Sequence, residues 1–191
     1  MIGILGFQGS FWEHKSMLDK LNIKNLIVKN KEDLNKIDGL IIPGGESTVI
    51  KKFIDEELNE SLNKFVNIDK KPTLGTCAGI IVLSNTIQGE DKKIIGGLDI
   101  TIDRNYYGSQ NDSFAEETTI IPSNQIKKQI FIRAPFIQNI SSKIIIIAKT
   151  GNKITGVKQD NIIGLTFHPE LSNDDTIYKY FLSLFKNNFI F

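Results

Sequence analysis

Short apolar runs that alternate with helix-like segments constrain the fold of this chain more than any other feature of its sequence. In the first half, runs rich in Ile, Val and Leu lead through polar or glycine-containing junctions into amphipathic segments. This alternation is typical of an α/β domain, in which helices cover a sheet. In the second half, similar runs follow one another with little helix between them, which indicates that the sheet is mixed.

The expected elements extend from the first residues to the C-terminal region. Strands are expected at residues 2–7, 26–28, 38–42, 73–75, 98–102, 118–121, 130–132, 143–148, 153–158 and 161–167, the last two as a hairpin. Helices are expected after Ser10, near Ser47 and after Cys77. Aromatic residues at helical spacing in 178–185 indicate a last helix that packs on the sheet. No repeat or linker interrupts the chain, so the sequence predicts one three-layer α/β domain over residues 1–191, with a mixed, mostly parallel central sheet.

Composition and charge argue against several classes of protein. The chain has 191 residues, which is enough to bury a substantial core in one domain. Its formal net charge of +1 gives no reason to expect nucleic acid or a membrane surface as a partner. The longest apolar run, 144–148, is far shorter than the ~18 residues of a membrane span. Because the chain begins directly with a strand-like run, without a basic or apolar leader, we expect a cytoplasmic location.

The single cysteine, Cys77, lies in the segment Gly75-Thr76-Cys77-Ala78-Gly79, between an expected strand and an expected helix. It cannot form an internal disulfide, and one thiol with two histidines makes a poor zinc site. A lone cysteine is most often a small buried hydrophobe. Glycines on both sides of a potential nucleophile at such a junction nevertheless favour a nucleophile elbow at the carboxyl end of the sheet. There, the N-terminus of the following helix would favour the thiolate.

A second group of candidate residues, Phe167-His168-Pro169-Glu170, ends the last expected strand. Pro169 favours an extended conformation for His168, and residues two apart in an extended chain face the same side. Glu170 can therefore orient the imidazole, which leaves its other nitrogen free to take a proton from Cys77. This is the arrangement of a nucleophile, base and orienting group. The alternative is a strand-end histidine beside a solvated glutamate.

The segment Pro43-Gly44-Gly45-Glu46-Ser47-Thr48 forms a third junction, after the strand at 38–42. Its two glycines allow backbone N–H groups to approach a ligand, and the following helix adds its dipole. This loop can supply one donor of an oxyanion hole, with the amide of Ala78 as the other. A strand-to-helix turn capped by Ser47 or Thr48 explains the same residues and is compatible with that role.

Two arginines and one further histidine complete the candidates. Arg104 and Arg133 are the only arginines in a sequence whose other basic residues are all lysine. If drift towards AT-rich codons replaced arginine wherever lysine serves, these two remain where a planar, bidentate fork is needed, for example against a carboxylate. His14 follows Glu13 in the first expected helix. We interpret His14 as a residue of the helix surface or of an interface, outside the triad.

Taken together, these motifs resemble the class I glutamine amidotransferases, whose triad is Cys-His-Glu and whose domain is flavodoxin-like. The finer resemblance is to the glutaminase subunits of pyridoxal 5′-phosphate synthase, and it covers essentially the whole chain in consistent order. Six blocks carry it: Gly3 to Gly9, Pro43 to Thr48, Gly75 to Gly79, Arg104 to Phe114, Phe131 to Pro135, and Phe167 to Leu171. Within the fourth block, Ser109 stands where relatives commonly carry a basic residue.

The resemblance implies a role for each candidate residue. The implied catalytic residues are Cys77 as nucleophile, His168 as proton carrier and Glu170 as the group that holds His168. The implied glutamine-binding residues are Gly45, Glu46, Ser47, Arg104, Ile132 and Arg133. The implied oxyanion hole consists of Gly44, Gly45 and Ala78. The family also implies a regulatory role for Gln8, which is tied to switching the oxyanion loop when the synthase docks.

The implied reaction hydrolyses L-glutamine to glutamate and ammonia and needs no metal or organic cofactor. The implied partner is the lyase subunit of pyridoxal 5′-phosphate synthase, which accepts the ammonia within a hetero-oligomer. Two alternatives stay open from the sequence. One is a glutaminase subunit that serves another amidotransferase, and the other is a non-catalytic regulatory subunit that keeps the fold.

Overall fold

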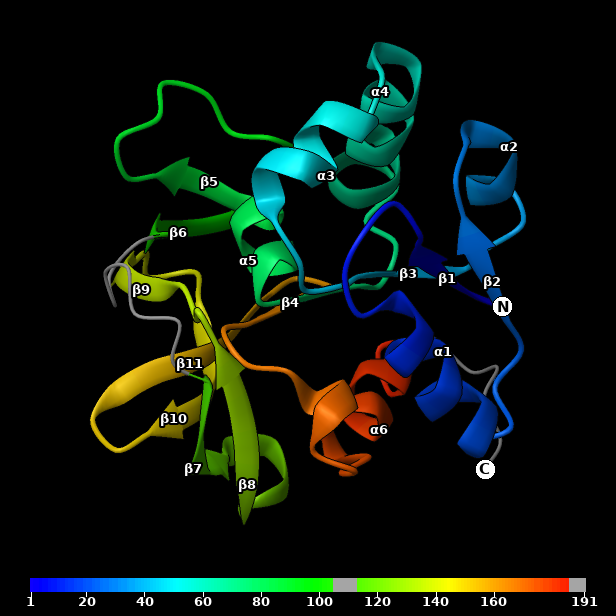
Figure 1. Cartoon of the computed structure of the whole chain (residues 1–191). Coiled ribbons are helices and arrows are strands. Elements are labelled where there is room, and N and C mark those ends of the chain that lie inside the picture. The colour runs from blue at the N-terminus through cyan, green and yellow to red at the C-terminus, as the bar shows by residue number, and fades with distance from the viewer. Residues whose placement is uncertain (105–112, 186–191) are drawn as a thin grey trace.

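The computed structural model describes residues 1–104 and 113–185, and in it a long twisted sheet separates two layers of helices (Figure 1). The nine-stranded sheet has the order β2-β1-β3-β4-β12-β11-β10-β7-β8. Its strands are β1 (Ile2–Leu5), β2 (Asn25–Val28), β3 (Gly39–Ile42), β4 (Thr73–Thr76), β7 (Ser113–Ile120), β8 (Gln125–Ile132), β10 (Ile145–Thr150), β11 (Lys153–Gln159) and β12 (Ile162–Leu165). The strands from β2 to β12 pair in parallel, and the four beyond β12 pair antiparallel.

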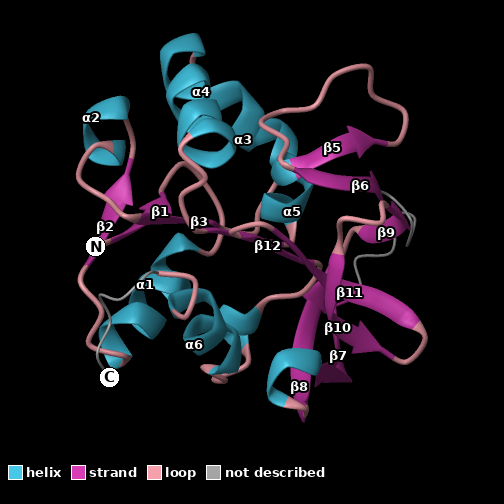
Figure 2. Cartoon of the chain, turned by 180° about the vertical axis from the view of Figure 1, so that it is seen from behind, coloured by secondary structure: helices cyan, strands magenta, loops and turns pink. Residues whose placement is uncertain are grey.

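The helices form two layers, one on each side of the sheet, and the opposite views of Figures 1 and 2 both show this arrangement. One layer contains α2 (Lys31–Leu34), α3 (Ser47–Phe53), α4 (Glu56–Asn63) and α5 (Ala78–Leu83), and the other contains α1 (Phe11–Lys20) and α6 (Thr176–Leu182). Each layer packs against the sheet through its own apolar core. Along β3, Leu40 and Ile42 enter the core on one face, whereas Ile41 enters the core on the other. This alternation is the side-chain period of a strand.

A second, three-stranded sheet lies beside the α5 layer. It consists of β5 (Ser84–Ile87), β6 (Leu98–Asp103) and β9 (Phe136–Ile140), in the order β5-β6-β9. Shorter helical turns are the π-helix η1 (Lys64–Ile68) and the 3₁₀ turns η2 (Ile121–Ser123) and η3 (Pro169–Leu171). Among the described residues, no helix combines the length and the apolar character that crossing a bilayer requires.

The predicted fold class, an α/β domain with a mixed central sheet, is confirmed. The expected hairpin is also present, because β11 and β12 pair antiparallel with Gln159 opposite Ile162. Several expected boundaries were wrong by two residues: β1 ends at Leu5, β12 ends at Leu165, and β10 begins at Ile145. β7 and β8 begin five residues earlier than expected. The strands β5 and β9 and the helices α2 and α4 were not anticipated.

The parallel part of the sheet brings the four junctions of interest to one edge. The chain segments that follow β1, β3, β4 and β12 all leave the carboxyl ends of neighbouring parallel strands. This is the edge at which open α/β sheets bind their ligands. The fold therefore gathers the segments that begin at Gly6, Pro43, Cys77 and Thr166.

Candidate active site

Cys77 occupies a strained turn between β4 and α5. Its backbone has φ 49° and ψ −104°, a conformation that side chains rarely adopt. The turn is so tight that a Cβ on Gly79 would lie 2.1 Å from the carbonyl oxygen of Ile42, and one on Gly75 would lie 2.7 Å from the backbone of Gly79. Only glycine fits at either position. The residues thus form the nucleophile elbow that the sequence predicted, with Cys77 at the N-terminus of α5.

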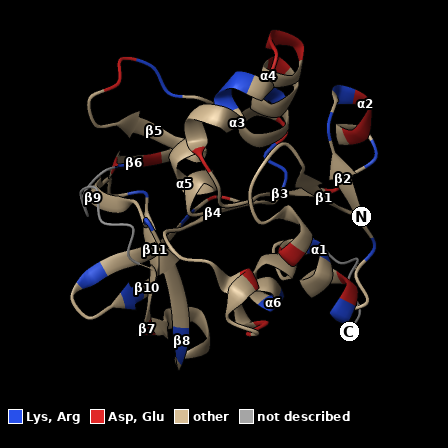
Figure 3. Ribbon diagram, in the orientation of Figure 1, with Lys and Arg blue, Asp and Glu red and all other residues tan. Residues whose placement is uncertain are grey.

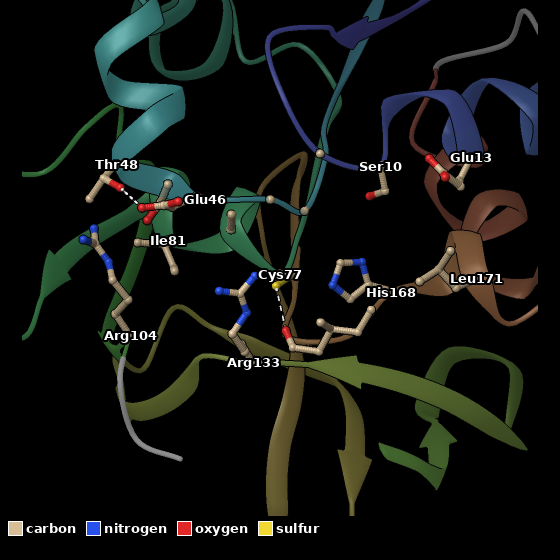
Figure 4. Close-up of a pocket in the computed structure, with 16 residues that line it drawn as sticks. Ser10, Glu13, Glu46, Thr48, Cys77, Ile81, Arg104, Arg133, His168 and Leu171 are labelled. Atoms are coloured by element: carbon tan, nitrogen blue, oxygen red, sulfur yellow. Dashed lines mark hydrogen bonds between the residues drawn. The ribbon is translucent and has the colours of Figure 1, made fainter. Parts of the chain in front are cut away.

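His168 lies three residues after the end of β12 and is held by both its backbone and its ring. Its N–H donates to the carbonyl of Ile130 at 2.8 Å, and its Nδ1 lies 2.7 Å from Oε1 of Glu170. A Cβ on Gly44 would lie 2.3 Å from Cε1 of His168 and 3.1 Å from Cβ of Cys77. The ring and the thiol-bearing side chain therefore meet at Gly44, and Figure 4 shows the ring beside the sulfur. Within the described part of the chain, Nε2 of His168 has no hydrogen-bond partner.

The charged forms of His168 and Glu170 stabilise each other. Burial lowers the pKa of His168, but the Cys77 sulfur and the Glu170 carboxylate outweigh it and raise that pKa to about 10. Burial raises the pKa of Glu170, but His14 and His168 outweigh it and lower that pKa to about 2. At neutral pH, Glu170 is therefore ionised and the charged form of His168 is favoured.

Three hydrogen bonds fix the loop after β3: two are made by Gly44 and one by Glu46, on the two sides of Gly45. The N–H of Gly44 donates to Oγ1 of Thr76 at 3.0 Å, and its carbonyl accepts from the N–H of Ser10 at 3.2 Å. The N–H of Glu46 donates to Oε1 of Gln8 at 2.7 Å. Gly45 itself has φ 154°, and a Cβ there would lie 2.9 Å from Oε1 of Gln8. The β1 junction thus determines the position of this loop.

A pocket of about 500 Å³ opens in front of Cys77. Figure 4 shows Arg133 and His168 on either side of the sulfur, with Arg104 and Glu46 farther along the pocket. Arg104 forms an ion pair with Glu90 through Nη2 at 2.7 Å, and its Nε is buried without a partner among the described residues. Arg133 is exposed and has φ 43°. The thiol of Cys77 donates a long, 3.6 Å hydrogen bond to the carbonyl of Ile132.

Most of the candidate residues therefore share one pocket. Its walls include Gly44, Gly45, Glu46, Ser47, Cys77, Ala78, Arg104, Ile132, Arg133 and His168. Glu170 and Gln8 do not line it: Glu170 lies behind His168, and Gln8 lies behind the loop at Glu46. Ser109 falls outside the described residues. Among the residues that the structure describes, no three His, Cys, Asp or Glu side chains are grouped to hold a metal ion.

The interpretation of His14 as a surface or interface residue was wrong. Its side chain is completely buried between α1, α6 and the elbow, where it contacts Thr76, Tyr178 and Glu170. The sequence contained a usable signal, because His14, Met17, Leu18 and Leu21 are spaced as one face of a helix. Ser10 was also missed as a partner of Glu170, to which its hydroxyl donates at 2.5 Å.

Acidic and basic residues are dispersed over the outer helices and loops, and both signs occur in the α3–α4 region of Figure 3. This distribution matches the near-neutral net charge, although the charged residues of α4 itself, Glu56, Glu57 and Glu60, are all acidic. The concentrated chemistry of the described chain lies instead at the pocket in front of Cys77.

Comparisons with known proteins show the family of the chain. The SNO glutamine amidotransferase family matches residues 4–187. The pyridoxal 5′-phosphate synthase subunit PdxT of Thermoanaerobacter sp. (strain X514) is 44% identical over 187 residues, which cover 96% of this chain and 98% of the relative. The subunit of the same name from Bacillus cereus (strain B4264) is 39% identical over 186 residues, covering 97% and 94%.

Solved structures give the same result. The crystal structure of a glutamine amidotransferase superimposes with a TM-score of 0.89 at 35% identity and covers 96% of this chain and 97% of the other. A putative GMP synthase subunit from Thermoplasma acidophilum, 18% identical with a TM-score of 0.67, covers 96% and 92% and shares the fold. The resemblance inferred from the six sequence blocks is confirmed. The chain belongs to the SNO glutamine amidotransferase family.

Proposed function

We propose that this chain is the glutaminase subunit of a pyridoxal 5′-phosphate synthase, with Cys77 as nucleophile, His168 as proton carrier and Glu170 as its orienting carboxylate. One observation carries the proposal: a buried imidazole, paired with a carboxylate, meets the side chain of an elbow cysteine at the floor of a pocket. The family match over residues 4–187 supports treating residues 1–191 as one glutamine amidotransferase domain.

The first half of the reaction forms a thioester. The Cys77 thiolate attacks the side-chain amide carbon of glutamine, and the carbonyl oxygen becomes an oxyanion. The Gly44–Gly45 peptide and the amide of Ala78 stabilise this oxyanion, and the amide of Ala78 is the first of α5, where helix N–H groups lack intrahelical partners. Nε2 of His168 gives its proton to the departing nitrogen, so that ammonia leaves and a glutamyl thioester stays on Cys77.

The second half of the reaction regenerates the thiolate. His168, now neutral, takes a proton from a water molecule, whose oxygen attacks the thioester carbon. The tetrahedral intermediate collapses, glutamate leaves, and His168 is again protonated beside the Cys77 thiolate. Glu170 stabilises the imidazolium in both halves, since its Oε1 lies 2.7 Å from Nδ1.

The substrate is held by its backbone groups at the far side of the pocket. Arg104 and Arg133 offer guanidinium forks to the α-carboxylate, and the exposed carboxylate of Glu46 can accept from the α-ammonium group. Ser47 and Ile132 complete the binding surface. Glutamine in this orientation presents its side-chain amide to Cys77.

Partner docking would control the reaction through the loop around Gly45. Gln8 ties the β1 junction to the N–H of Glu46, one residue after Gly45. A synthase subunit that displaces the β1 junction would therefore reorient the neighbouring peptide. Because one oxyanion donor is typically worth ~10²–10³ in rate, a single peptide rotation can switch the activity.

The test is pyridoxal 5′-phosphate formation by the purified chain together with its cognate synthase subunit. We expect formation with glutamine as nitrogen source, and we expect Cys77→Ala to abolish it while formation from ammonium salts continues. Partner binding by Cys77→Ala is checked by sedimentation, since the substitution removes only the nucleophile.

Two results would contradict the proposal. Glutamate release that feeds a different captured synthase, with none from the pyridoxal 5′-phosphate pair, would identify a glutaminase of another amidotransferase. No glutamate release with or without a synthase subunit would identify a non-catalytic regulatory subunit.

A further inference from the structure

His14 is a buried titratable residue that the reaction described above does not use. It is 0% exposed and lies in α1, on the side of Glu170 away from the pocket. Its Nδ1 lies 2.7 Å from the hydroxyl of Tyr178 in α6. Its Nε2 lies 3.1 Å from Oγ1 of Thr76 and 3.4 Å from Oε2 of Glu170. One imidazole thus connects α6, the end of β4 and the carboxylate behind His168.

The partners of His14 select one of its two neutral tautomers. Oε2 of Glu170 is a carboxylate oxygen and has no hydrogen-bond partner within the described part of the chain, so a ring lone pair at 3.4 Å would be repelled. A proton on Nε2 removes this repulsion and faces the carboxylate. Nδ1 is then an acceptor, and the hydroxyl of Tyr178 donates to it. In the opposite tautomer, Nε2 would present its lone pair to the carboxylate.

Burial favours the neutral form of His14. Desolvation lowers its pKa, against an opposing effect of the Glu170 carboxylate, while the charge of His168 lowers the pKa further and Glu13 of the same helix raises it. Burial also raises the pKa of Tyr178 well above its usual value, so its hydroxyl stays a donor. A neutral ring can therefore keep the same proton position over the working pH range.

We propose that His14, as its neutral Nε2–H tautomer, is a positioning residue that orients Glu170 and, through Thr76, the peptide of Gly44. Oε1 of Glu170 is held by Ser10 and His168, and the Nε2–H of His14 faces the other oxygen. Thr76, which contacts His14, also accepts the N–H of Gly44 at the start of the oxyanion loop. This inference rests on the proposed function of Glu170 and of that loop.

The tautomer can be tested directly because His14 and His168 are the only histidines in the chain. Nitrogen-15 NMR of the imidazole rings then contains two sets of signals, and the His14→Leu variant assigns both. We expect His14 to show a protonated Nε2 and an unprotonated Nδ1. This state should not change between about pH 5 and pH 9, a range in which an ordinary imidazole titrates. A protonated Nδ1, or titration as in an exposed histidine, would overturn the proposal.

Two variants with side chains of similar size distinguish a positioning role of His14 from a packing role. The amide nitrogen of glutamine takes the place of Nε2, whereas that of asparagine takes the place of Nδ1. His14→Gln therefore keeps a donor towards Glu170, and His14→Asn does not. We expect His14→Asn to lower kcat by about 10–100-fold, the range for a small misplacement of a catalytic group, with KM for glutamine little changed. His14→Gln should keep kcat near the wild-type value.

The titration of His168, followed by NMR, gives a readout that does not need activity. If His14→Asn loosens Glu170, the pKa of His168 falls in that variant. In His14→Gln, the pKa of His168 should equal that of the wild type. Thr118→Val is the matched control, because Thr118 is a buried hydroxyl in β7 that pairs with Thr150 outside the site. It should lower stability but leave kcat and the His168 titration unchanged.

Equal kcat and equal His168 titration in wild type, His14→Gln and His14→Asn would overturn the positioning role. So would a loss of kcat in His14→Asn that tracks only its unfolded fraction. If the wild-type chain and its synthase partner release no glutamate, the proposed function fails. The NMR experiments still decide the role of His14 in that case.

Discussion

At the scale of single residues, Cys77 combines the proposed nucleophile with a backbone conformation that glycine would adopt more easily. A non-glycine residue in such a conformation costs about 1–3 kcal/mol. We therefore predict that Cys77→Gly is more stable than Cys77→Ala by about 1 kcal/mol, the reverse of the usual order of these residues in helices and strands. Urea unfolding of both variants measures this difference.

Both variants lack the thiol, so the comparison isolates the backbone from the chemistry. Each should also be inactive as a glutaminase. If Cys77→Ala is the more stable of the two, the backbone of the elbow is not strained.

Arg133 provides the second prediction at this scale. Its guanidinium lines the pocket but is exposed, so its replacement changes binding rather than folding. Lysine keeps the charge and loses the fork, and losing one charge-assisted hydrogen bond costs about 1.5 kcal/mol, or about tenfold in KM. We predict that Arg133→Lys raises KM for glutamine about tenfold and leaves the unfolding free energy unchanged. An unchanged KM would show that Arg133 does not bind the carboxylate.

Single residues also show what the sequence can and cannot reveal about the site. Arg104 and Arg133 stood out by composition alone, and both line the pocket. By contrast, no sequence motif indicated that Arg104 forms an ion pair with Glu90. His14 was misinterpreted because its partners, Thr76 and Tyr178, come from distant segments that only the folded sheet brings together.

At the scale of elements, α5 can begin directly after Cys77 because Gly75 and Gly79 let the helix pack closely against the sheet. A Cβ on Gly79 would lie 2.1 Å from a backbone oxygen of β3, which cannot move without displacing the strand. We predict that Gly79→Ala destabilises the fold by about 3 kcal/mol, although alanine favours helices more than glycine does. Thermal or urea unfolding measures the loss.

Gly3 in β1 provides the matched control for this element. A Cβ there would lie 2.4 Å from Cδ1 of Ile37 and 2.7 Å from Cγ2 of Val28, which are side-chain atoms that can shift more readily than a backbone oxygen. Gly3→Ala should therefore cost less, about 1 kcal/mol. Similar losses in both variants would mean that close backbone approach is not what requires Gly79.

The elements that sequence patterns missed have identifiable physical reasons. β5 follows α5 without a single intervening residue, so no turn signal separates helix from strand. β9 has mostly half-buried or exposed positions and is a strand because it pairs with β6. α4, by contrast, carried a readable signal: Asp55 caps its first turn, and Leu58 and Leu62 lie four apart on its buried face.

At the scale of the whole molecule, the buried charges behind Cys77 link stability to pH. Glu170 has a pKa of about 2 instead of 4.5, so its contribution to stability is complete above about pH 4.5 and is lost as the pH falls towards 2. His168 has a pKa of about 10 instead of 6.5, so its contribution is complete below about pH 6.5 and is lost as the pH rises towards 10. The two contributions are both complete only between about pH 4.5 and 6.5.

Glu170→Gln removes the carboxylate that both contributions share and keeps the size of the side chain. We therefore predict that the variant is less stable than wild type, with the largest difference in unfolding free energy between about pH 4.5 and 6.5. The difference should shrink towards pH 3, where Glu170 gains a proton on unfolding, and towards pH 10, where His168 of the native protein loses its proton. Urea unfolding of both proteins across this range measures the difference, and a value independent of pH would mean that the two buried groups are not linked as an ion pair.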